Sequence, residues 1–141
     1  MTYEQSFHVD APVARVFDFF RDPNNWAGLE PGGVQFKDVR LTKEGLGTRY
    51  SWTARIAGVS VDGFNEFTEF VPDRHITDRS SSSLEGTWTY SFEPDGSGMK
   101  LTVANRVRSF WRLPPLERLL DWVSAKTHEP RFARLKAMLE E

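Results

Sequence analysis

The chain has 141 residues, of which 39% are hydrophobic and 27% charged, with no cysteine and a net charge of −2. This length is typical of one domain, and we expect residues 1–141 to form it. The lack of cysteine excludes disulfides and thiolate chemistry, and the near-neutral charge argues against a nucleic-acid partner. Met1–Asp10 has no continuous apolar core of the kind that a signal peptide needs, and no apolar run is long enough to span a bilayer. We therefore expect a cytoplasmic protein with no integral membrane association.

The N-terminal part predicts a strand followed by two short helical segments. Residues Thr2–Val9 alternate between two faces, as a strand does. Asp10 followed by Pro12 predicts a helix that begins with Asp10 as its N-cap. This helix stops before Asp22-Pro23, and Asn24–Trp26 predicts a second, very short turn. Its predicted buried residues are Val13, Val16, Phe17 and Phe20.

The middle of the chain predicts six further strands separated by short turns. Because such turns join neighbours in a sheet, the strands are expected to be antiparallel. Phe64 and Phe67 have opposite parity within one strand, which predicts a β-bulge near Gly63. The expected strands are Val34–Leu41, Gly47–Ala57, Val59–Phe70, His75–Ser82, Thr87–Glu93 and Met99–Arg108.

The C-terminal segment, Leu113–Glu141, predicts a long helix that is kinked near Pro130. Its apolar stripe is expected to cover the aromatic face of the sheet, since the first helix is too short for that. The predicted fold is therefore α+β, with a curved seven-stranded antiparallel sheet wrapped around the terminal helix. The apolar positions of the stripe are Leu116, Leu119, Leu120 and Val123 before the proline, and Phe132, Leu135 and Leu139 after it.

This order of elements is that of the helix-grip fold, and several segments resemble one family. The segments are Asp10–Trp26, Gly45–Arg49, Phe67–Arg74, Gly98–Thr102 and Leu135–Glu140. Together they resemble the START-like polyketide cyclase/dehydrase and lipid-transport superfamily (SRPBCC). The resemblance implies a deep cavity between the sheet and the terminal helix that binds an apolar or aromatic molecule, such as a lipid or a polyketide.

The expected ligand contacts are aromatic and polar side chains on the inner face of the sheet and on the terminal helix. Asn105 is in phase with Leu101 and Val103, so its amide must find a partner in the protein, in water or in a ligand. The full set of candidates is Tyr50, Trp52, Asn65, Phe67, Trp88, Tyr90, Val103, Asn105, Trp111, Leu116, Leu120 and Val123.

Two alternatives to simple binding stay open. One is a cyclase or dehydratase that acts by positioning its substrate, with His75, Tyr50, Tyr90 and Asn105 as the candidates for proton transfer or carbonyl polarisation. The other is an interaction module whose interior is filled by its own aromatic rings. No spacing typical of a metal, nucleotide or nucleophile site occurs, so we expect no metal and no cofactor.

Overall fold

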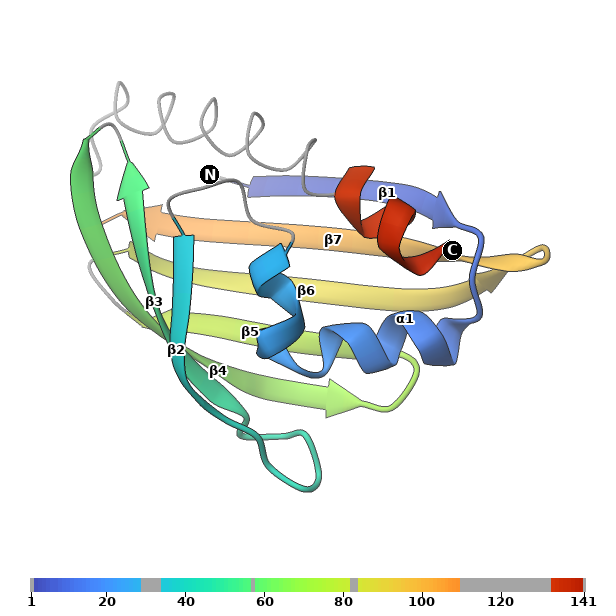
Figure 1. The fold of residues 1–141 in the computed structure, drawn as a ribbon, viewed down its shortest axis with the longest axis horizontal. Helices are drawn as coiled ribbons and strands as arrows, with labels where there is room; N and C mark the ends of the chain where they lie inside the picture. Colours follow the sequence, from blue (N-terminus) through green and yellow to red (C-terminus); the bar gives the residue numbers. More distant parts are fainter. Residues whose placement is uncertain (1, 29–33, 57, 82–83, 110–132, 141) are drawn as a thin grey trace.

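The computed structural model describes residues 2–28, 34–56, 58–81, 84–109 and 133–140. Seven strands form one antiparallel sheet, as the sequence predicts, and their order is β1-β7-β6-β5-β4-β3-β2. The sheet is strongly curved, and the helical segments lie on its concave side (Figure 1). The strands are β1 (Thr2–Val9), β2 (Val34–Arg40), β3 (Arg49–Ile56), β4 (Val59–Val71), β5 (His75–Ser81), β6 (Leu84–Asp95) and β7 (Gly98–Ser109).

The helix α1 (Val13–Phe20) is followed by the short 3-10 helix η1 (Pro23–Gly28). The prediction that Asp10 caps α1 is wrong. The chain stays extended through Pro12, which occupies the N-cap position with a ψ of 147° and makes no side-chain capping bond. Asp10 is therefore too far from the first helical turn, and its carboxylate instead lies 2.6 Å from His8 Nε2.

The predicted bulge exists in β4 but at a different place. The pairing of β4 with β3 is regular through Gly63, and the register shift lies between Phe67 and Glu69 on the β5 side. Phe64 is consequently 40% exposed on the outer face, whereas Phe67 is buried. Gly63 has a different role, because a Cβ at this position would collide with the indole of Trp52.

Some strand ends differ from the predicted ones. β6 begins and ends outside the predicted Thr87–Glu93, because its ladder with β7 continues to the pair Asp95–Gly98. β3 begins only at Arg49, and not at the predicted Gly47. Gly45 and Gly47 both have a φ of +86°, which a β-strand does not allow, so they form a loop before the strand.

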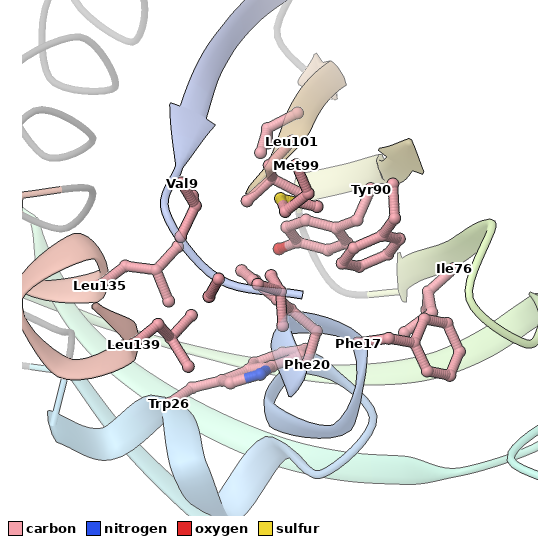
Figure 2. Close-up of a cluster of buried hydrophobic side chains, with 14 of the residues drawn as sticks. Val9, Phe17, Phe20, Trp26, Ile76, Tyr90, Met99, Leu101, Leu135 and Leu139 are labelled. Carbon is pink, nitrogen blue, oxygen red and sulfur yellow. The ribbon is translucent and has the colours of Figure 1, made fainter. Parts of the chain in front are cut away.

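The main core fills one part of the concave face. Phe20 of α1 and Trp26 of η1 lie against the sheet, and Trp26 is 1% exposed. Leu135 and Leu139, in the helix formed by residues 133–139, point into the same cluster (Figure 2). The end of the predicted terminal helix therefore packs as expected, while α1 and η1 supply more of the cover than predicted. The remainder of that helix, residues 113–132 with Pro130 and Phe132, lies outside the described residues.

Candidate functional site

The concave face of the sheet has two parts of different chemistry. The first, called here the apolar half, packs against α1, η1 and helix 133–139 and consists of Ile76, Tyr90, Phe92, Met99, Leu101 and Val103. The second, called here the polar half, lies farther along the same strands and consists of Trp52, Asn65, Asp78, Ser80, Trp88 and Asn105. Asn65, Asp78, Ser80 and Asn105 are all at most 5% exposed.

Strand register brings the polar half together from five strands. Asp78 pairs with Trp88, and Trp88 pairs in turn with Asn105, so the three residues form one row across β5, β6 and β7. Asn65 pairs with Ser80 in the next row. Side chains directly opposite one another in such rows have Cβ atoms roughly 4.5–5.5 Å apart. The polar half is therefore one contiguous surface.

Two hydrogen bonds order one side of this surface. The phenol of Tyr50 on β3 donates to Asp78 Oδ2 at 2.5 Å, and both side chains are buried. The indole of Trp52 donates to Asn65 Oδ1 at 2.6 Å. Bonds to a carboxylate in a buried setting are among the stronger ones in proteins, so the Tyr50–Asp78 pair holds a fixed geometry.

The other side of the surface carries polar atoms that no described residue satisfies. Asn105 is 2% exposed, and within the described part of the chain neither Oδ1 nor Nδ2 has a hydrogen-bond partner. The same holds for Ser80 Oγ and, outside the polar half, for Trp26 Nε1 of η1. Leaving a buried donor or acceptor unpaired costs roughly 1–3 kcal/mol, so native proteins seldom do so without a reason.

Several predicted ligand contacts are core residues of the apolar half or its border. The ring centroids of Tyr90 and Phe20 are 5.0 Å apart, and those of Phe67 and Trp26 are 6.0 Å apart. Val103 is 1% exposed in the same cluster. All three side chains pack in the hydrophobic core. Four further candidates, Trp111, Leu116, Leu120 and Val123, lie outside the described residues.

His75 is not part of the polar half. Its neighbour Ile76 faces inward and is fully buried, which places His75 on the outer face of β5. There its Nε2 lies 2.8 Å from Glu69 Oε2. Glu69 also lines a hollow of about 400 Å³ on the outer face, together with Arg79, Glu85 and Arg106. Charged walls of this kind do not suit an apolar ligand.

A second titratable cluster lies at the end of β1. His8 Nδ1 is 3.0 Å from Asp95 Oδ2, and the Asp10 contact engages its other ring nitrogen. The hydrogen bond with Asp95 and then that with Asp10 raise the pKa of His8 above its ordinary value of 6.5. The side chains are largely exposed, so this cluster ties strand ends together outside the polar half.

Asp78 and Ser80 are candidate site residues that the sequence reasoning misses. Their strand carries polar side chains on both faces, so its alternation does not by itself separate inside from outside. The sequence does contain one clue: Ile76, Asp78 and Ser80 lie at alternate positions, so Asp78 and Ser80 face the same side of the strand as the apolar Ile76. Among the described residues there is no group of three or more His, Asp or Glu side chains placed to hold a metal, and no helix suited to crossing a membrane.

Comparison with known proteins agrees with this architecture. Over 99% of the chain, the fold matches a protein from Thermus thermophilus (TM-score 0.83, 18% identity, 97% of that chain). It matches the Zhui aromatase/cyclase from Streptomyces sp. R1128 over 99% of this chain and 93% of that one (TM-score 0.80, 15% identity). It matches a Chromobacterium violaceum protein over 100% of this chain and 99% of that one (TM-score 0.72, 23% identity).

At sequence identities this low, the matches show a similar fold only. No curated protein matches the sequence. The family described as "Polyketide cyclase / dehydrase and lipid transport" matches residues 1–140, nearly the whole chain. With the seven-stranded sheet and the buried concave surface described above, the chain belongs to the polyketide cyclase/dehydrase and lipid-transport family.

Proposed function

We propose that the protein, as one domain of residues 1–141, binds an apolar or aromatic small molecule against the polar half of the concave face. Membership of the family implies a cavity for a hydrophobic ligand. The observation that carries the proposal is the contrast between the two halves of this face. The apolar half is occupied by Trp26 and Phe20, whereas the polar half keeps buried Asn105 and Ser80 atoms without a hydrogen-bond partner among the described residues.

Such a surface suits a ligand of mixed character. Binding pockets are mostly apolar and aromatic with a few convergent polar groups that fix the orientation of the ligand. Trp52 and Trp88 supply the aromatic area, and Asn105 and Ser80 supply the polar groups. A lipid, a polyketide or a related aromatic molecule has this combination of properties.

A matched pair of variants on β5 tests the location. Ser80 is 5% exposed and faces inward, whereas its neighbour Ser81 is exposed on the outer face. Ser80→Leu is expected to weaken binding of apolar ligands at least about tenfold, because the added side chain occupies the site. Ser81→Leu is expected to leave binding unchanged. Binding is measured by calorimetry and by thermal shift. A ligand at about 100 times its Kd is expected to stabilise the folded protein by about 2.7 kcal/mol.

The same pair separates a ligand site from a filled core. Overpacking a core without free space costs about 1–3 kcal/mol, whereas filling an open site costs little stability. If Ser80→Leu is strongly destabilised and the wild type responds to no lipid, polyketide or terpenoid, the interaction module with a filled interior replaces the binding proposal.

A cyclase or dehydratase is a second candidate function, favoured by the Tyr50–Asp78 hydrogen bond. A phenol bonded to a buried carboxylate is a pair that can donate and recover a proton beside a bound substrate. Tyr50→Phe and Asp78→Asn are expected to lower turnover of a polyketide-like substrate by about 100-fold or more while ligand binding persists. His75→Gln, on the outer face, is the matched control. If turnover survives both inner substitutions, this assignment of roles is wrong.

A further inference from the structure

The side chain of Asn105 presents two opposite hydrogen-bonding functions at one buried point. Its Nδ2 is a donor and its Oδ1 is an acceptor, and neither has a partner among the described residues. The contrast with Asn65 is informative, because the indole of Trp52 already occupies Asn65 Oδ1. Of the two buried asparagine side chains, Asn105 is therefore the one whose donor and acceptor both lack a partner among the described residues.

The neighbours of Asn105 favour an uncharged, flat group. Trp88 lies directly opposite Asn105 across the β6–β7 pair and brings an aromatic ring to the same place. Asp78 follows in the same row, and it is the only ionisable side chain in the polar half as defined above. No Lys or Arg belongs to that set, so an anionic ligand would find no countercharge among these residues. Burying an unpaired charge is far more costly than burying a neutral group.

From this geometry we infer that Asn105 is the specificity-determining residue for ligands that carry an uncharged acceptor and donor side by side on a planar ring, as a lactam does. A primary amide and a lactam form two parallel hydrogen bonds: Nδ2–H donates to the lactam carbonyl, and the lactam N–H donates to Oδ1. Both orphaned atoms of Asn105 are then satisfied at once. This inference rests on the proposed function and names the polar feature by which that site selects its ligand.

Four two-ring probes test the inference on the wild-type protein. Carbostyril is a benzo-fused lactam with the full donor–acceptor edge, N-methylcarbostyril lacks the donor, naphthalene lacks both functions, and naphthoate carries a charge. Carbostyril is expected to bind at least about tenfold more tightly than N-methylcarbostyril, because methylation leaves Oδ1 unpaired in a buried site. Naphthoate is expected to bind most weakly. Affinities come from calorimetry, and the Asn105 side-chain NH₂ resonances are expected to move with carbostyril, because its carbonyl accepts a hydrogen bond from Nδ2–H.

Asn105→Leu supplies the second test, because the leucine side chain has the same number and branching of heavy atoms as asparagine and no polar atom. It is expected to erase the preference of carbostyril over N-methylcarbostyril while binding of naphthalene is retained or improved. The wild-type probe comparison decides even if this variant does not fold.

The outcomes separate the two proposals. If naphthalene binds but carbostyril and N-methylcarbostyril bind equally well, the role of Asn105 is overturned and the apolar binding site stands. If Asn105→Leu still prefers carbostyril over N-methylcarbostyril, another residue recognises the lactam donor and acceptor, and the inference is again wrong. If none of the four probes binds but a lipid, polyketide or terpenoid does, the inference is overturned and the proposed function stands; if none of these ligands binds either, both fail.

Discussion

Removing the hydroxyl of Tyr50 tests whether the buried polar network stabilises the fold. In Tyr50→Phe, Asp78 Oδ2 loses the donor that lies 2.5 Å away, and the ring packing against Trp26 is kept. A hydrogen bond to a charged group contributes about 1.5–3 kcal/mol, and Asp78 is only 1% exposed, so water cannot replace the lost donor. We expect a loss of about 1.5–3 kcal/mol in the free energy of unfolding.

Thr53→Val is the matched control, because Thr53 Oγ1 donates to Asp62 Oδ1 at 2.8 Å on the exposed side of the sheet. There water replaces the lost partner, and the expected cost is below about 0.5 kcal/mol. The assay is urea unfolding followed by tryptophan fluorescence, with thermal unfolding as a second measure. For a chain of this length, about 4 °C of Tm corresponds to 1 kcal/mol, so Tyr50→Phe is expected to lower Tm by about 6–12 °C.

A double-mutant cycle with Asp78→Asn assigns the effect to the pair. If the charge of Asp78 makes the bond strong, Tyr50→Phe is expected to cost about 1 kcal/mol less in the Asp78→Asn background than in the wild type. Equal, small losses in Tyr50→Phe and Thr53→Val would refute the reasoning, because the buried bond would then be no stronger than an exposed one.

Three further predictions concern the frame around the site. Leu135→Ala is expected to cost about 2–5 kcal/mol in urea unfolding, because Leu135 is 1% exposed in the core, whereas exposed Met138→Ala is expected to change little. In an NMR titration His8 is expected to show a pKa above 6.5, and this pKa is expected to fall in Asp95→Asn. The stability that protonated His8 contributes is fully present below the pKa of His8 in the unfolded chain, and it is lost as the pH rises through the pKa of His8 in the folded protein. Gly63→Ala is expected to displace the Trp52 indole, which its Cβ would strike, and to shift the Trp52 Nε1–H resonance.

Each of these has a result that would contradict it. A stable Leu135→Ala protein would mean that helix 133–139 does not anchor the core. An unchanged His8 titration in Asp95→Asn would remove the hydrogen bond as the cause of the raised pKa. A Trp52 resonance that stays in place in Gly63→Ala would mean that β3 and β4 yield instead of the indole.

The alternation of the central strands is readable from the sequence, and it locates much of the candidate site. Trp52, Trp88 and Asn105 are predicted to face inward because side chains in a strand alternate between two faces, which is a property of adjacent residues. The antiparallel order of β2 to β7 follows from short turns in the same way, whereas the pairing of β1 with β7 does not. These inferences need no knowledge of what lies across the sheet.

The tertiary structure alone decided which inward residues lie together in the polar half and which pack in the hydrophobic core. Asp78 and Tyr50 are 28 positions apart, and only the pairing of β3 with β4 and of β4 with β5 brings the phenol to the carboxylate. Trp26 of η1 packs beside Tyr90 of β6, and this contact between distant segments places Tyr90 in the core. Hydrogen-bond partners and free volume depend on contacts between distant strands and helices, and a local pattern carries no information about them.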